Sequence, residues 1–181
     1  MVVTIVTAGE FPSYVPDAAT AIVRIYDPVE DWRTDGAGLA NAGWGAALPL
    51  AFWDVGMTGM GMLETALVRM LGRRRELCLS LGQRLFGDDI PWRPFLPADA
   101  CDIRRFADSL AARGVRNVLV VCNNGRARSW TVARWLADHL GAEPPQARGW
   151  LRESEWIART LTACAKSRRP TRVPPMAPLP V

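Results

Sequence analysis

The segment VLVVCNNGRARS, residues 118–129, joins an apolar run to a short polar loop. An uninterrupted run of Val and Leu such as 118–121 is typical of a strand that is buried on both faces of a parallel sheet. After the loop, apolar residues recur at helical spacing from Ser129 to about Leu140, which predicts a helix. Strand, tight loop and helix in this order indicate an α/β fold with a central, mainly parallel sheet.

The rest of the chain predicts further strands and helices around this unit. Runs of β-branched and apolar residues predict three more strands, over 2–7, 20–26 and 48–52. Apolar residues at helical spacing predict helices over 60–86 with a break near Gly72, over 100–114 and over about 150–165. The Gly- and Ala-rich segment 33–45 is predicted to be a loop. We therefore expect a three-layer fold, in which a central sheet of about four strands is flanked by helices.

The length of 181 residues suits one domain with a tail. Residues 1–165 are predicted to form the domain, whereas residues 166–181 contain five prolines and are predicted to be extended or disordered. The formal net charge is +4, but seven basic and two acidic residues lie within 148–181, which leaves −1 for residues 1–147. Because the excess of basic over acidic residues lies in the last helix and the tail, nucleic acid is not an expected partner.

The chain lacks the usual sequence signals for membranes, secretion and metal binding. The sequence contains no stretch of 18 uncharged apolar residues, so no transmembrane helix is predicted. The first residues lack a basic region and include Glu10, so we expect no signal peptide and a cytoplasmic location. The four cysteines show no CxxC spacing and do not indicate a disulfide framework. His139 is the only histidine, so neither a histidine-based zinc site nor a Ser-His-Asp triad is expected.

The loop 122–129 combines an anion site with a nucleophile. Backbone N–H groups between a buried strand and a helix point inward, and the helix dipole adds positive charge there. Cys122 at the start of such a loop is stabilised as a thiolate and becomes a nucleophile near neutral pH. Arg128 can hold two oxygens of one phosphate with its planar guanidinium. Gly125 allows close approach of the backbone, and Ser129 can donate a hydrogen bond to the departing thiolate.

The spacing Cys-x2-Gly-x2-Arg-Ser resembles the phosphate-binding loop of the protein tyrosine phosphatase superfamily, in both its tyrosine-specific and its dual-specificity members. The wider pattern, from about residue 20 to 140, is similar to that of small bacterial phosphatase-like proteins. In these a strand ends in Asp-Pro, a later strand ends in an aromatic residue and Asp, and a helix precedes the loop. The resemblance implies a catalytic Cys122, Arg128 and Ser129, and no metal or organic cofactor. It also implies a phosphate-binding loop made of Asn123, Asn124, Gly125, Arg126, Ala127 and Arg128.

Two residues depart from the pattern of that superfamily. Val121 stands where the family usually has a histidine that tunes the thiolate. Arg126 adds a second cation, which either favours a doubly acidic substrate or is a solvated surface residue.

Low-molecular-weight phosphatases also carry Cys-x5-Arg-Ser, but their loop follows the first strand. Here only 59 residues follow Cys122, with no further strand pattern, so we rank that class low.

Two aspartates are candidates for the general acid that protonates the leaving group. Asp54 directly follows the strand over 48–52 in the sequence FWDVG, which is the topological place of such an acid. Asp89 lies 33 residues before Cys122, close to the spacing that the family commonly shows. We favour Asp54, which requires residues 57–90 to be an inserted helical segment.

The sequence therefore predicts a cysteine-dependent phosphatase that hydrolyses phosphotyrosine or a related phosphomonoester through a cysteinyl-phosphate. The alternative is a weak or inactive pseudophosphatase that binds a phosphorylated partner, an alternative that Val121 and the undecided acid leave open. The expected partner in either case is a phosphorylated protein or small molecule. Neither the natural substrate nor the oligomeric state follows from the sequence.

Overall fold

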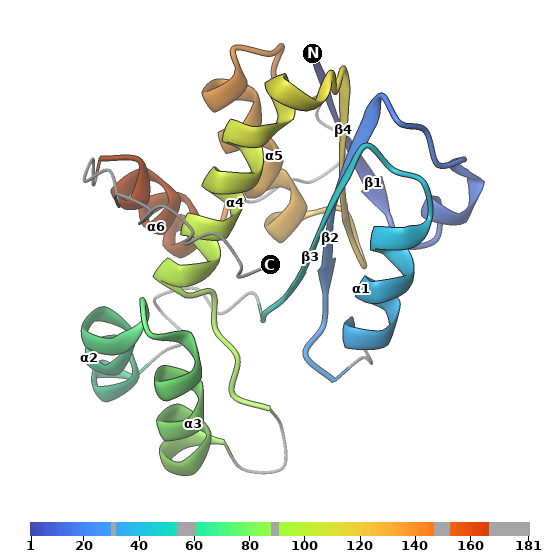
Figure 1. The fold of residues 1–181 in the computed structure, drawn as a ribbon. Coiled ribbons are helices and arrows are strands. Elements are labelled where there is room, and N and C mark those ends of the chain that lie inside the picture. The colour runs from blue at the N-terminus through green and yellow to red at the C-terminus, as the bar shows by residue number, and fades with distance from the viewer. Residues whose placement is uncertain (30–31, 54–60, 88–90, 147–152, 167–181) are drawn as a thin grey trace, which may run out of the picture.

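The computed structural model describes residues 1–29, 32–53, 61–87, 91–146 and 153–166. Its centre is a four-stranded sheet whose strands are all parallel, in the order β1-β4-β2-β3 (Figure 1). The strands are β1 (Val2–Thr7), β2 (Thr20–Tyr26), β3 (Ala46–Ala51) and β4 (Asn117–Cys122). Because all four strands run the same way, their carboxyl ends meet at one edge of the sheet.

Six α-helices and two short 3-10 helices (Phe11–Ser13 and Ala111–Arg113) lie in the described part of the chain. The α-helices are α1 (Trp32–Asn41), α2 (Met62–Leu71), α3 (Arg75–Phe86), α4 (Pro97–Leu110), α5 (Ala127–Leu140) and α6 (Glu155–Lys166). In Figure 1, α1 lies on one side of the sheet, whereas α4 and α5 lie on the other with α6 against α4. The helices α2 and α3 extend away from the sheet, at the end of the molecule far from the N-terminus.

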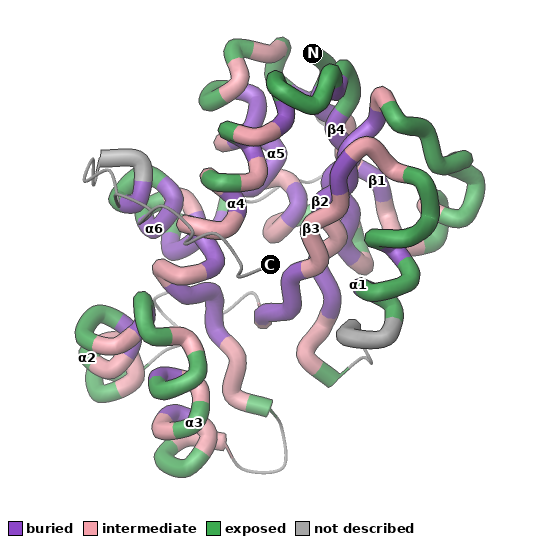
Figure 2. Tube along the Cα trace, viewed as in Figure 1, coloured by how far each residue is buried: buried purple, intermediate pink, exposed green. Residues whose placement is uncertain are grey.

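The alternation of side chains along the strands produces two separate cores. Ile22 of β2 and Leu119 of β4 pack with Leu39 of α1 on one face of the sheet. Val23 of β2 and Val120 of β4 belong to the larger core on the other face, beneath α4, α5 and α6. Figure 2 shows buried residues along the strands and on the helices around them, whereas α2 and α3 are largely exposed or intermediate. These observations confirm the α/β class and the parallel central sheet with helices on both faces.

The prediction of a loop over 33–45 was wrong, because most of it is helix α1. Gly36 and Leu39 are buried among residues 35–41 of this helix. A Cβ atom on Gly36 would lie 2.9 Å from Cβ of Pro49 in β3, so glycine permits the close approach of helix and strand. Tertiary packing of this short buried face thus overrides the low helix propensity of the glycines. The third predicted strand also begins earlier, at Ala46 rather than 48, and ends at Ala51.

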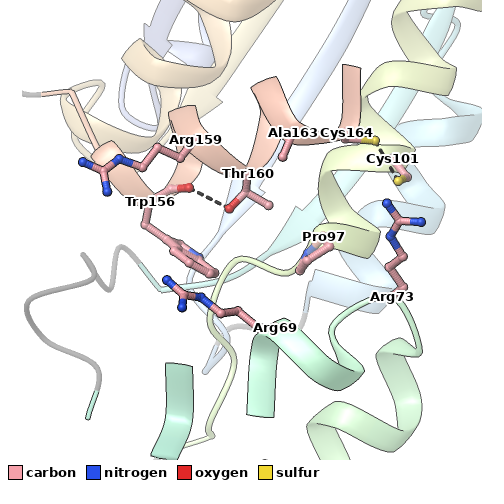
Figure 3. A pocket seen from close by; sticks show the side chains of 9 residues that line it. All are labelled: Arg69, Arg73, Pro97, Cys101, Trp156, Arg159, Thr160, Ala163 and Cys164. Carbon is pink, nitrogen blue, oxygen red and sulfur yellow. Dashed lines mark hydrogen bonds between the residues drawn. The ribbon is translucent and has the colours of Figure 1, made fainter. Parts of the chain in front are cut away.

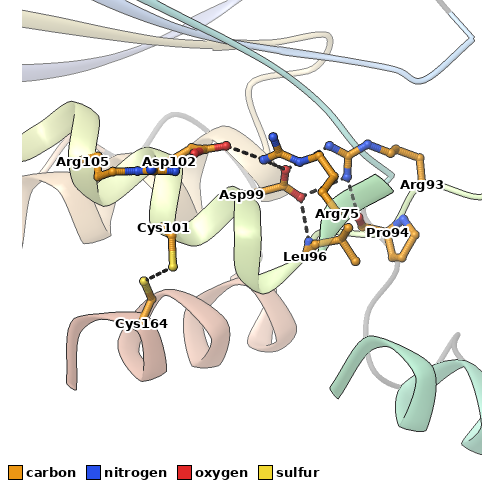
Figure 4. Close-up of polar contacts among 9 residues, drawn as sticks. All are labelled: Arg75, Arg93, Pro94, Leu96, Asp99, Cys101, Asp102, Arg105 and Cys164. Carbon is orange, nitrogen blue, oxygen red and sulfur yellow. Dashed lines mark hydrogen bonds and ion pairs between the residues drawn. The ribbon is translucent and has the colours of Figure 1, made fainter. Parts of the chain in front are cut away.

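A buried carboxylate fixes the segment that precedes α4. Asp99 is fully buried and accepts a hydrogen bond from the backbone N–H of Leu96 at 2.8 Å. Arg93 donates to both of its oxygens, at 3.0 and 2.9 Å, and Arg75 at the start of α3 donates to one at 2.8 Å (Figure 4). Since a buried charge is tolerated only when it is paired, this network holds α3, residues 93–96 and α4 together.

No helix in the described ranges is long and apolar enough to cross a membrane. The predicted boundary between a domain at 1–165 and a tail at 166–181 falls at the end of α6, and residues 167–181 lie outside the described residues.

Candidate active site

Cys122 lies at the carboxyl edge of the sheet, beside the first turn of helix α5. It is the last residue of β4, and only 2% of its surface is exposed. Its register partner is Thr7, the last residue of β1, and its carbonyl accepts a hydrogen bond from Ala8 N–H at 3.0 Å. The Cys122 thiol donates to Oγ of the fully buried Ser129, at 3.1 Å. The sulfur is thus next to the positive end of the α5 dipole, which favours an anion there.

The loop between Cys122 and α5 turns sharply at Gly125. This residue has φ +63°, in the left-handed region that residues with a side chain rarely adopt. A Cβ atom at this position would also lie 3.0 Å from Cγ2 of Thr7, so the loop backbone approaches β1 closely. The first helical residue is Ala127, and the N–H groups of this first turn have no acceptor within the helix. The strand, loop and helix therefore have the backbone geometry of a candidate anion site.

The guanidinium group of Arg128 is fixed between the ends of two strands. The Nη1 atom donates to the carbonyl of Phe52 at 2.9 Å and to that of Tyr26 at 3.3 Å. The Nη2 atom pairs with Oδ1 of Asp27 at 2.6 Å. Only 11% of the Arg128 side chain is exposed, so these partners hold it in one orientation at the same sheet edge as Cys122.

Asp27 is a site residue that the sequence interpretation missed. It directly follows β2, and its two carboxylate oxygens contact different parts of the site. Oδ1 pairs with Arg128, and Oδ2 accepts a hydrogen bond from the side-chain amide of Asn123. The sequence signal was the Asp-Pro pair after the strand over 20–26, which entered the family resemblance as a strand end and not as a site residue.

The other predicted loop residues lie around this framework in different environments. Arg126 and Asn124 are exposed, whereas Asn123 and Ala127 are partly buried. Arg126 immediately precedes α5, at its N-cap. The loop therefore presents one fixed and one exposed arginine.

Both candidate acids, Asp54 and Asp89, lie outside the described residues. The residues that flank them are hydrogen-bonded to each other: the Trp53 indole N–H donates to the carbonyl of Pro91 at 2.9 Å. The backbone N–H of Trp53 also donates to the Arg93 carbonyl at 2.9 Å. Because the two ends of segment 54–90 meet at this junction, the flanking chain does not favour one acid over the other.

The other three cysteines lie away from this edge. Cys78 of α3 is fully buried, and burial raises the pKa of its thiol. Cys101 of α4 and Cys164 of α6 contact each other with their sulfurs 2.8 Å apart (Figure 4). Burial, followed by the neighbouring Cys101 thiol, raises the pKa of Cys164. Since a raised pKa disfavours the thiolate, Cys78 and Cys164 are poor nucleophiles at neutral pH.

Comparison of the chain with protein-family models, with curated proteins and with solved structures gave no match. Among the described residues, no group of three or more His, Cys, Asp or Glu side chains is arranged to hold a metal ion. The functional argument therefore rests on the chemistry of the loop and its neighbours.

Proposed function

We propose that the protein is a cysteine-dependent phosphatase of the protein tyrosine phosphatase type, acting on phosphotyrosine or a related phosphomonoester. One observation carries the proposal: Cys122, in contact with Ser129 on the first turn of α5, shares a sheet edge with the fixed guanidinium of Arg128. A nucleophile, a helix N-terminus and a planar cation are the parts that phosphoryl transfer to a thiolate requires. The all-parallel sheet with helices on both faces is compatible with the three-layer fold expected for this class.

The first chemical step uses the Cys122 sulfur as the nucleophile. The thiolate attacks phosphorus, so the S–P bond forms while the ester P–O bond breaks. The general acid, Asp54 or Asp89, donates its proton to the leaving oxygen, and the product alcohol or phenol departs. The phosphate oxygens are stabilised by the N–H groups of the loop and by Arg128. Arg128 contacts the Phe52 and Tyr26 carbonyls through Nη1 and Asp27 through Nη2. In the proposed complex, two of its remaining N–H groups bind two phosphate oxygens.

The second step returns the free enzyme. A water molecule attacks the cysteinyl-phosphate, the S–P bond breaks and inorganic phosphate leaves. The bond between Cys122 and Ser129 supports this step, because the hydroxyl 3.1 Å from the sulfur can reverse its role and donate to the departing thiolate. The nearby α5 N-terminus favours the same negative charge.

The proposal is tested by hydrolysis of para-nitrophenyl phosphate between pH 5 and 8. A phosphatase releases nitrophenol in proportion to enzyme, and inorganic phosphate inhibits the release competitively. If phosphate binds but no nitrophenol is released across this range, the phosphatase proposal is wrong and the pseudophosphatase takes its place.

We expect Asp27→Asn to reduce kcat/KM roughly 10- to 100-fold, because Asp27 orients both Arg128 and Asn123 and a displaced binding group weakens catalysis by about this factor. The asparagine keeps the size of the side chain but loses its charge. Asp27→Glu should recover part of the activity. Steady-state kinetics with both variants, together with their melting temperatures, checks this expectation. An Asp27→Asn enzyme with wild-type kcat/KM would contradict the positioning role.

We expect Asp54→Asn to abolish the alkaline decline of the pH–rate profile and to lower kcat about 10²- to 10⁴-fold, since asparagine has no proton to donate. Asp54 is tested first because it directly follows the predicted strand over 48–52. Asp89→Asn is the matched variant, measured over the same pH range. Loss of the alkaline limb in Asp89→Asn alone would transfer the role to Asp89, and no effect in either variant would exclude both.

A further inference from the structure

A cavity lies apart from the loop of Cys122. It has a volume of about 300 Å³, is open to solvent on one side, and is lined by residues of α2, Arg73 just beyond it, the start of α4 and α6 (Figure 3). None of its lining residues belongs to the segment 122–129. A volume of this size is at the lower end of the range found for small-molecule sites.

The mouth of this cavity carries positive charge that the described residues do not neutralise. Its lining includes Arg69, Arg73 and Arg159, and no acidic residue. Arg69 in the last turn of α2 and Arg73 just beyond it are four residues apart, and neither has an ion pair or hydrogen bond within the described ranges. Arg159 of α6 pairs with Glu155 at 3.1 Å, in a largely exposed contact that contributes little energy. Two guanidinium groups without a partner among the described residues therefore line this cavity, at separate places around it (Figure 3).

The interior of the cavity is apolar and rigid on one side. The ring of Trp156 lines it, and the indole N–H of this residue donates to the carbonyl of Phe95 at 2.8 Å. Trp156 is otherwise buried, so the hydrogen bond and the packing fix the ring plane. Pro97 and Ala163 add further apolar surface (Figure 3). An apolar wall below a cationic mouth is complementary to a molecule that has an apolar body and an anionic head.

We propose that this cavity binds a small organic anion, with an aromatic or aliphatic body against its apolar wall and an acidic group at one of the two arginines, Arg69 or Arg73. The proposal does not depend on the phosphatase chemistry. The cavity is nevertheless connected to the candidate active site, because Phe95 packs edge-on against Phe52 with ring centroids 4.8 Å apart. The carbonyl of Phe52 in turn accepts the hydrogen bond of Arg128.

Calorimetric titration of the full chain with naphthalene-2-sulfonate tests the proposal, with the uncharged 2-naphthalenemethanol as the matched ligand. We expect the sulfonate to bind about 10-fold or more tightly than the alcohol, since each hydrogen bond to a charged group contributes to affinity. The double variant Arg69→Gln/Arg73→Gln should lose at least about 10-fold in sulfonate affinity. The variant Arg113→Gln/Arg116→Gln removes the same charge from exposed positions outside the cavity, and should bind as the wild type does.

The place of binding is checked by alkylation, because Cys101 lines the cavity and is partly exposed. Bound sulfonate should slow the reaction of Cys101 with iodoacetamide, as followed by peptide mass spectrometry. Three results would overturn the proposal: no binding of the sulfonate, equal affinity for the alcohol, or equal loss in the two arginine variants. A fourth result, protection of Cys122 instead of Cys101, would place the sulfonate at the loop and would also overturn the proposal.

Discussion

Replacement of Cys122 by serine should lower kcat for para-nitrophenyl phosphate by about four orders of magnitude or more, because removal of a catalytic nucleophile has effects of this size. Serine has nearly the shape of cysteine, and the sulfur lies in a buried position beside Ser129. The loop should therefore keep its conformation and its affinity for phosphate. A hydroxyl, unlike a thiol, is hardly ionised near neutral pH and does not attack phosphorus at a comparable rate.

The control for this experiment is Cys101→Ser, which alters a partly exposed thiol on α4, outside the loop 122–129. Its kcat should equal that of the wild type. Phosphate affinity is measured in parallel for Cys122→Ser, so that a loss of turnover with binding intact separates the chemical role from misfolding. Retention of more than about a tenth of the wild-type kcat in Cys122→Ser would exclude a cysteine nucleophile.

Arg128→Lys should reduce kcat/KM about 10²- to 10⁴-fold although the charge is conserved, as expected for loss of a transition-state oxyanion donor. Lysine presents a single ammonium group, whereas Arg128 contacts the Phe52 carbonyl and Asp27 with different nitrogens while offering further N–H groups to the phosphate. Replacement should therefore affect both the orientation of the cation and its bidentate contact with the substrate.

Arg126→Lys is the matched variant, because Arg126 is an exposed arginine of the same loop. We expect its kcat/KM to stay within about tenfold of the wild type, since a solvated cation acts mainly by its charge. Steady-state kinetics of both variants at one ionic strength makes the comparison. Equal losses in the two variants would show that charge alone matters and would contradict the fixed-fork role of Arg128.

Local patterns were sufficient to predict the central part of the fold. The apolar run 118–121, the polar loop and the helical spacing that follows carry their information within about twenty residues, and β4 and α5 lie where expected. The strands β1 and β2 were likewise predicted at their observed limits. Helix α1 was missed, because its stability comes from the contact of Gly36 and Leu39 with the sheet and not from local propensity.

The contacts around the candidate site were less accessible to sequence reasoning. Arg128 and Asp27 are 101 positions apart, and only the parallel arrangement of β2, β3 and β4 brings them together. The contact of Arg128 with the Phe52 carbonyl is also long-range, so no local sequence pattern predicts it. The sequence alone does not decide whether Asp54 or Asp89 is the general acid. Asp54 follows Trp53 and Asp89 precedes Pro91, and the hydrogen bond between Trp53 and Pro91 is a long-range contact that local patterns do not predict.

The covalent intermediate is the most direct test of the proposed chemistry. The enzyme is mixed rapidly with para-nitrophenyl phosphate, quenched with acid within one turnover, digested and analysed by mass spectrometry. We predict that the peptide containing Cys122 gains the mass of one phosphoryl group, that the modification is on sulfur, and that it disappears as inorganic phosphate is released. Turnover with the Cys122 peptide unmodified, or with the phosphoryl group on another residue, would contradict the account.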